Sequence, residues 1–201
     1  LTGLDQNKPT VTNVLTGING QINTPITTDG TYLYFGTWPG GSNAGTYYQV
    51  KLSDYSVKTF TPDSYGFYWA GAVSDGTNVY FGSDNGLLYW RSIADFDTTG
   101  GSYKDGLTVE WKAKLGPDPD TNVTSTSTPT KVGDRIYVGY YSGFNAGGVQ
   151  CVSADGSSVK TVVEGDGFPV QSSIVVMGDG TGTDYLYFNT NAQKGVGYCY
   201  S

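Results

Sequence analysis

Seven aromatic side chains lie in short, glycine-containing stretches rather than in the apolar runs that are typical of strands. They are Trp38, Tyr65, Phe67, Trp69, Tyr140, Tyr141 and Phe144. Aromatic rings on loops can stack on sugar rings or anchor a side chain of a protein partner. We therefore expect a binding surface for a carbohydrate or a protein. The alternative is that these rings pack beneath the loops and fill the centre of the domain.

Catalytic chemistry has few candidates. The sequence contains no histidine, which removes the commonest general base and the commonest metal ligand. Glutamate occurs only at positions 110 and 164, and Asp166 lies near the second. A glycosidase needs two carboxylates about 5–9.5 Å apart across a cleft, and Glu110 falls within a predicted outer strand. We predict that the chain is not an enzyme, with a glycosidase as the alternative.

One acidic stretch has spacing that could suit a metal. Asp118, Asp120 and Asn122 place oxygen atoms at alternating positions, as at the start of a calcium loop. Val123 stands where such a loop needs glycine, and Pro129 stands where it needs the bidentate glutamate. The stretch is therefore interpreted as a solvated turn, and we predict neither a metal site nor a cofactor.

The two cysteines, Cys151 and Cys199, show no metal-binding spacing. They occupy matching places in neighbouring copies of the repeat described below. Equivalent positions of that kind are normally too far apart for a disulfide, whose Cα atoms lie within about 7 Å. We interpret them as two small buried side chains.

Charge and composition exclude other classes. The net charge is −7, and only 11 residues are lysine or arginine, so binding to nucleic acid is not expected. No apolar run approaches the ~20 residues of a membrane-spanning helix. The sequence begins at Leu1 without methionine or a signal-peptide pattern, and it holds one glycosylation triplet, Asn122-Val123-Thr124. We expect a secreted or cell-surface module within a larger, multidomain chain.

A fourfold internal repeat determines the predicted fold. Four segments share an apolar–Tyr–apolar pattern, with their tyrosines 46, 57 and 50 residues apart, and each follows an Asp/Gly turn suited to a hairpin. The segments are Leu33–Gly36, Val79–Gly82, Ile136–Gly139 and Leu186–Asn189. We call their tyrosines, Tyr34, Tyr80, Tyr137 and Tyr187, the repeated tyrosines.

Each tyrosine segment is the second strand, B, of a predicted four-stranded unit. The preceding A strands are Thr24–Thr27, Ala70–Val73, Thr128–Lys131 and Ser173–Val176. The following C strands are Tyr47–Leu52, Leu87–Arg91, Val149–Val152 and Gly197–Tyr200. The outer D strands are Val57–Phe60, Leu107–Trp111 and Val159–Val163.

The fourth copy lacks a D strand, and the N-terminal segment Thr10–Leu15 is a candidate to supply it. The order along the chain is then D-A-B-C, with copies at roughly 10–52, 53–92, 107–153 and 154–201. We predict an all-β propeller of four four-stranded blades over residues 10–201, closed by that strand, after an extension over residues 1–9. The alternative is half of a larger, eight-bladed propeller.

This repeat resembles the PQQ-type, quinoprotein-like propeller repeat over roughly residues 10–201. The clearest copy runs from Ser127-Thr128-Pro129 through Ile136-Tyr137-Val138-Gly139 to Gly148-Val149-Gln150. The resemblance implies a radial arrangement of four-stranded blades. The family's enzymes bind a quinone and calcium and oxidise alcohols or sugars.

The family's functional residues do not carry over. The adjacent-cysteine pair of the quinoprotein alcohol dehydrogenases is absent, and the Asp-x-x-Thr-Gly turn leading to tryptophan survives only in fragments at Asp54, Phe60 and Trp111. The resemblance therefore favours a non-catalytic member, either a binding module or a structural spacer of a larger surface protein. A quinoprotein-like enzyme is a further alternative.

Overall fold

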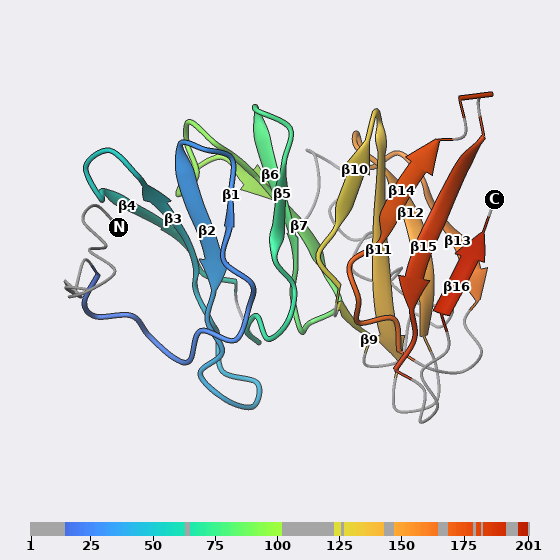
Figure 1. The fold of residues 1–201 in the computed structure, drawn as a ribbon. Coiled ribbons are helices and arrows are strands. Elements are labelled where there is room, and N and C mark those ends of the chain that lie inside the picture. The colour runs from blue at the N-terminus through green and yellow to red at the C-terminus, as the bar shows by residue number, and fades with distance from the viewer. Residues whose placement is uncertain are drawn as a thin grey trace, which may run out of the picture.

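A computed structural model of the chain describes residues 15–62, 65–101, 123–125, 127–142, 147–164, 169–178, 180–181, 183–191 and 197–200. Within these residues the chain forms four antiparallel sheets and no helix. The sheets stand side by side in chain order from one end of the molecule to the other (Figure 1). The prediction of an all-β fold is therefore confirmed.

The first sheet consists of β1 (Thr27–Thr28), β2 (Tyr32–Gly36), β3 (Tyr47–Lys51) and β4 (Val57–Phe60). The second consists of β5 (Ala72–Ser74), β6 (Asn78–Gly82), β7 (Leu88–Ser92) and β8 (Gly100–Gly101). The third contains β10 (Thr130–Val132), β11 (Arg135–Ser142), β12 (Gly147–Ser153) and β13 (Val159–Glu164), and β9 (Val123–Ser125) also pairs with β11. The fourth consists of β14 (Val175–Gly178), β15 (Asp184–Asn189) and β16 (Gly197–Tyr200).

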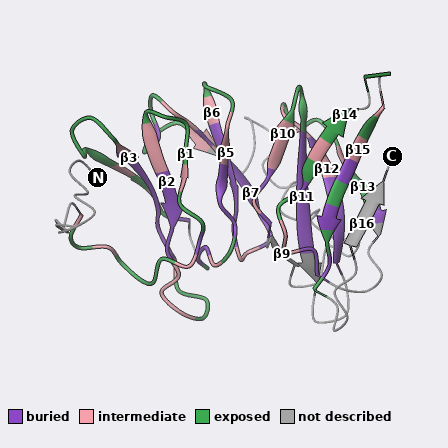
Figure 2. Ribbon diagram, viewed as in Figure 1, coloured by how far each residue is buried: buried purple, intermediate pink, exposed green. Residues whose placement is uncertain are grey.

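The repeated tyrosines occupy equivalent positions, one in each sheet. Their partners on the A strands are Thr27, Val73, Thr130 and Val175. Three of the four tyrosines are buried between neighbouring sheets, but Tyr187 is 40% exposed. The fourth sheet differs because, among the described residues, no following sheet covers its outward face (Figure 2).

An aspartate in the A–B turn anchors the repeated tyrosine in the first two sheets. Asp29 accepts hydrogen bonds from the backbone N–H groups of Thr31 and Tyr32 and from the Tyr34 hydroxyl, at 2.9, 2.8 and 2.8 Å. Asp75 holds Tyr80 in the same way, at 3.0 Å. Partial burial opposes ionisation of both aspartates, but these donors stabilise the carboxylate and lower its pKa. The Asp-Gly turn of the sequence therefore also fixes a core side chain.

Aromatic packing joins the first and second sheets. Tyr47 and Phe81 stack with ring centroids 3.8 Å apart, and Phe67 contacts Tyr47 edge-on at 4.9 Å. The guanidinium of Arg91 lies 4.6 Å from the ring centroid of Phe60, and its Nε donates to the Phe96 carbonyl at 2.6 Å. Both faces of the inner strands are covered here, which explains why the tyrosine segments are apolar without a break.

Two of the predicted outer strands lie wholly or largely outside the described residues. The fourth strand of the second sheet is β8, at Gly100–Gly101, whereas the predicted strand Leu107–Trp111 lies outside the described residues. Of the predicted closing strand Thr10–Leu15, only Leu15 is described, and it packs with Ile18 against the outward face of the first sheet. Among the described residues, no strand pairing joins the first sheet to the fourth.

Candidate functional site

The D–A and B–C loops lie together at one end of the sheets (Figure 1), and we call this end the hub face. Backbone hydrogen bonds join the loop after β4 to the B–C loops of both adjacent sheets. Phe67 N donates to Thr37 O at 3.1 Å, Tyr65 N donates to Ser42 O at 3.0 Å, and Asp84 N donates to Gly66 O at 3.0 Å. The segment Tyr65–Trp69 is therefore held in place between the first and second sheets.

Three rings of this face form a contiguous group, which we call the aromatic group: Trp38, Tyr68 and Trp69. Trp38 contacts Tyr68 at 5.1 Å between ring centroids, and Tyr68 contacts Trp69 at 4.4 Å, both edge to face. Trp38 and Tyr68 are half-buried, whereas Trp69 is 43% exposed. Trp38 is also fixed through its backbone, because its N–H and C=O both bond to Gln21 at 2.9 and 3.0 Å. Aromatic rings that are held in place and remain partly accessible suit stacking recognition.

Two of the seven predicted ligand-binding aromatics are core residues. Phe67 is fully buried among the rings between the first and second sheets, and Tyr140 is buried between the second and third. Tyr65 is exposed and adopts a left-handed φ of 62°. The side chain of Tyr141 and the whole of Phe144 lie outside the described residues.

The path of the loop explains the correction for Phe67. Phe67 points into the core, whereas Tyr68 and Trp69 remain accessible as the chain turns toward β5. Tyr68 was not among the predicted site residues, although it stands in the same aromatic run. Of the predicted set, the described structure leaves Trp38, Tyr65 and Trp69 accessible.

A half-buried carboxyl group lies beneath this loop. Asp84 follows β6 in the B–C loop of the second sheet and accepts a hydrogen bond from the backbone N–H of Tyr68. Burial raises the pKa of Asp84 to about 7, and the bond from Tyr68 only partly offsets that effect. The sequence Ser83-Asp84-Asn85-Gly86 indicates an ordinary turn, so it did not mark Asp84 as a carboxyl group with a raised pKa.

The A strands converge in a region that we call the hub, and side chains link neighbouring sheets there. Ala72 N donates to Thr27 Oγ1 at 3.3 Å, and Gly71 N donates to Thr128 Oγ1 at 2.9 Å. A repeated hydroxyl continues the pairing of strands A and B in three sheets, because it accepts a hydrogen bond from a backbone N–H of strand B. The donor–acceptor pairs are Gly36 with Thr24, Gly139 with Ser127 and Asn189 with Ser172.

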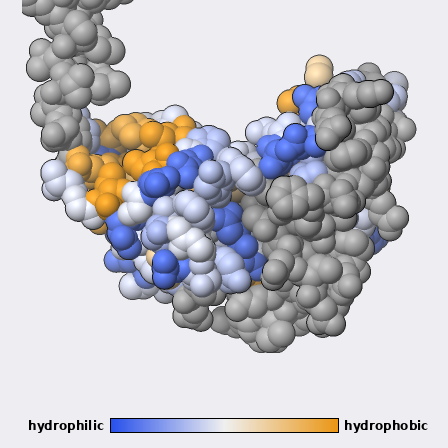
Figure 3. Space-filling view, turned by 90° about the horizontal axis from the view of Figure 1, so that it is seen from below, coloured by the Kyte–Doolittle hydropathy of each residue, from blue (hydrophilic) through white to orange (hydrophobic). Residues whose placement is uncertain are grey.

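A cavity of about 360 Å³ opens at this hub. Its lining consists of Asn23, Thr24, Pro25, Trp69 and Gln171. Asn23, Trp69 and Gln171 are equivalent in three copies of the repeat, since each lies four residues before the A-strand partner of a repeated tyrosine. The repeat therefore brings an indole and two amide side chains from distant parts of the sequence to one cavity. Figure 3 views the molecule from this end and shows a mixed polar and apolar surface.

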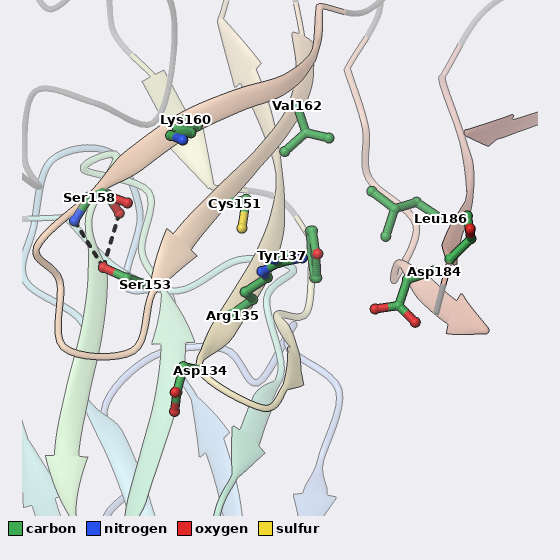
Figure 4. Close-up of a pocket in the computed structure, with 11 residues that line it drawn as sticks. Asp134, Arg135, Tyr137, Cys151, Ser153, Ser158, Lys160, Val162, Asp184 and Leu186 are labelled. Carbon is green, nitrogen blue, oxygen red and sulfur yellow. Dashed lines mark hydrogen bonds between the residues drawn. The ribbon is translucent and has the colours of Figure 1, made fainter. Parts of the chain in front are cut away.

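A second cavity, of about 690 Å³, lies between the third and fourth sheets at the end opposite the hub face. Figure 4 shows Tyr137 and Cys151 on one side of it and Asp184 and Leu186 on the other. Cys151 is paired with Tyr137 as Gln49 is paired with Tyr34 in the first sheet. Gln49 is buried and donates to the Ile93 carbonyl, whereas Cys151 lines the cavity.

The chemistry of this second cavity does not single out a ligand. Arg135 and Lys160 line it together with Asp134 and Asp184, so its charges balance. Burial raises the pKa of the Cys151 thiol, although the positive charge of Arg135 acts in the opposite direction. A thiol with a raised pKa is a poor nucleophile at neutral pH. We therefore place the candidate binding site at the hub face.

The part of the chain that the structure describes contains no group of three or more cysteine or acidic side chains placed to hold a metal ion. The weak candidates Asp118, Asp120 and Asn122 lie outside it. Among the described residues, no helix is long and apolar enough to cross a membrane.

No protein-family model matches the chain, and no curated protein matches its sequence. Among solved structures, the computationally designed Ika4 protein is similar over 95% of this chain and 98% of its own, with a TM-score of 0.58 and 10% identity. A europium-containing methanol dehydrogenase is similar over 80% of this chain and 34% of its own, with a TM-score of 0.52 and 13% identity. The extracellular domain of a one-component system from B. thetaiotaomicron is similar over 94% of this chain and 22% of its own, with a TM-score of 0.55 and 20% identity.

These likenesses establish a propeller-like fold. The chain spans about a third of the length of the methanol dehydrogenase and less of the extracellular domain. At such identities the similarity concerns the fold alone, because function depends on site residues that the fold does not specify.

Proposed function

We propose that this chain is a non-enzymatic binding module of a secreted or cell-surface protein, and that it holds a neutral carbohydrate at the hub face. The observation that carries the proposal is the position of Trp69. Its 43% exposed indole belongs to the aromatic group and also lines the hub cavity beside the amides of Asn23 and Gln171.

The side chains of this cavity match the chemistry of a sugar. An indole face packs against the C–H groups of a sugar ring, and carboxamides both donate to and accept from hydroxyl groups. The five lining residues carry no formal charge, which favours a neutral ligand over an ionic one. The volume of about 360 Å³ lies at the lower end of the range for small-molecule sites.

The site is also rigid before binding. Edge-to-face contacts hold the three rings of the aromatic group, and backbone bonds hold the two loops that carry them. A site that is already ordered spends less free energy on immobilising its side chains when a ligand binds.

The extracellular setting of the domain from B. thetaiotaomicron agrees with a secreted or cell-surface location for this chain. A protein ligand at the same rings and a spacer without a ligand are the alternatives. A screen of this chain on an array of neutral and charged glycans tests the proposal first, and we expect retention of neutral oligosaccharides.

Replacing Trp69 by alanine is expected to weaken binding of the best neutral oligosaccharide by at least about fivefold, which corresponds to about 1 kcal/mol. The physical reason is loss of the stacking face. The melting temperature should change little, because the indole is 43% exposed. Isothermal titration calorimetry measures the affinity, and its value should depend only weakly on salt because the contact is uncharged.

Tyr55 provides a matched control, since it is also 43% exposed but lies in the C–D turn of the first sheet, at the end opposite the hub face. Tyr55→Ala should bind the oligosaccharide as the natural chain does. Equal loss in both variants, or no glycan retained at any concentration, would exclude the hub site and favour the spacer.

A further inference from the structure

Each sheet presents two different faces to its neighbours. The repeated tyrosine lies on the face toward the following sheet, which we call the forward face, and the residues beside it lie on the backward face. The three internal contacts are Tyr34 with Val79 and Phe81, Tyr80 with Ile136 and Val138, and Tyr137 with Leu186 and Phe188. The same pairing of a forward with a backward face therefore recurs at every internal contact.

The A strands follow the same rule at the hub. Thr27 and Thr130 point forward and bond to the next A strand, at Ala72 N and Ile174 O respectively. Ala72 and Ile174 point backward and are 7% and 1% exposed. The position one residue before the partner of the repeated tyrosine is therefore buried wherever a sheet precedes it.

Both ends of the row break this rule. Ile26 occupies the backward position of Ala72 and Ile174, yet it is 59% exposed. At the other end, Val175 and Met177 lie on the forward face of the fourth sheet and are 53% and 58% exposed. Each end thus presents apolar side chains of the type that the internal contacts bury, and the two ends lie on opposite sides of the molecule (Figure 1).

We propose that the forward face of the fourth sheet docks on the backward face of the first sheet of a second copy of this chain, and that the reciprocal contact closes a ring of two copies. The contact continues the interface that already joins the sheets within one chain. Leu15 and Ile18 cover Phe35 and Tyr48 on the outer part of the first sheet and leave Ile26 open on the inner part.

The geometry of this contact is head to tail, because two different surfaces meet. Such contacts form a closed ring when the rotation between copies closes, and otherwise extend into a filament. When each copy supplies half of the ring, the two copies meet through two identical head-to-tail contacts, which we call junctions. The exposed apolar side chains at both ends are then buried, and no open sheet face remains.

Sedimentation velocity on this chain at about 5–200 µM tests the proposal. We expect the natural chain to sediment with twice its own mass. Met177→Asp and Ile26→Asp should each sediment as monomers, because each substitution damages both junctions of the pair. Tyr55→Asp, on the outer turn of the first sheet, should leave the pair intact. Circular dichroism and melting curves verify that the exposed-site variants fold.

Mixing the two monomeric variants gives a sharper result. The Ile26→Asp chain keeps an intact fourth sheet and the Met177→Asp chain keeps an intact first sheet, so one junction can form between them. We expect a one-to-one pair that is weaker than the natural one. A natural chain that is monomeric throughout the range overturns the proposal, and so does an Ile26→Asp chain that still pairs with itself.

Discussion

Replacing Tyr80 by alanine is expected to lower the free energy of unfolding by about 3–5 kcal/mol. The ring is 3% exposed and packs with Leu88, Ile136 and Val138 between the second and third sheets. Its hydroxyl donates to the Asp75 carboxylate at 3.0 Å. Alanine would therefore leave a cavity and would remove a hydrogen-bond donor from the Asp75 carboxylate. Chemical denaturation followed by tryptophan fluorescence measures the loss.

The fourth repeated tyrosine provides the control for this prediction. Tyr187 occupies the same register but is 40% exposed in the single chain, so in the monomeric Met177→Asp background Tyr187→Ala should cost much less than Tyr80→Ala. Tyr80→Phe should cost only about 1 kcal/mol, because it keeps the ring and removes one hydrogen bond. Equal costs for the two alanine variants in that monomeric background would mean that the chain itself covers the fourth sheet as fully as the second.

Replacing Asp84 by asparagine is expected to stabilise the fold at pH 8 and to change little near pH 4. Burial raises the pKa of Asp84 to about 7, from an ordinary value of 3.8. Between these values the folded chain holds a proton that the unfolded chain has released, so stability falls as the pH rises through about 7. A difference of about three units corresponds to on the order of 4 kcal/mol at high pH. Asparagine cannot ionise and removes this loss.

Urea denaturation at a series of pH values checks this result. The difference in unfolding free energy between Asp84→Asn and the natural chain should grow steadily from pH 4 to pH 8. Asp29 and Asp75 have lowered pKa values and contribute the opposite trend, since their stabilising effect is lost as the pH falls. They are present in both chains and cancel in the difference. Parallel pH profiles would show that Asp84 is ionised without cost in the folded chain.

The strands of the repeat were predictable because local chemistry determines them. Alternating turns and apolar tyrosine segments indicate the B and C strands of all four sheets, whereas each A strand begins two or three residues later than predicted. The turn glycines Gly30 and Gly76 adopt φ values of 89° and 87°, as the Asp-Gly signal requires. Two of the outer D strands, β4 and β13, also lie where the sequence places them.

Other features depend on tertiary context that the sequence pattern does not contain. The strand β8 is Gly100–Gly101, which has no strand propensity and is selected by its pairing with Trp90 and Arg91. The exposure of Tyr187 follows from its place at the end of the row, since its sequence resembles that of the buried copies. The difference between Phe67 and Trp69 follows from the direction in which one loop leaves the core.

The hub cavity could not be predicted from the sequence, because nothing in the repeat pattern relates the residues that line it. Asn23, Trp69 and Gln171 are residues of different chemical types, and they fall outside the part of each copy in which the repeat pattern is visible. Only the strand register shows that they are equivalent. The aromatic loops were predicted as a surface, and the structure divides that surface into core residues and accessible ones.

Indole N–H resonances give the most direct test of binding at the hub face. The chain has four tryptophans. Trp69 and Trp38 belong to the aromatic group, whereas Trp90 lies on β7 and packs between the second and third sheets. In a ¹⁵N-labelled sample, single Trp→Phe variants assign these signals. On titration with the best neutral oligosaccharide from the array, we expect the Trp69 signal to shift most and the Trp38 signal to follow. The Trp90 signal should stay in place. A shift confined to Trp90, or saturating binding that moves neither Trp69 nor Trp38, would contradict a binding site at the hub.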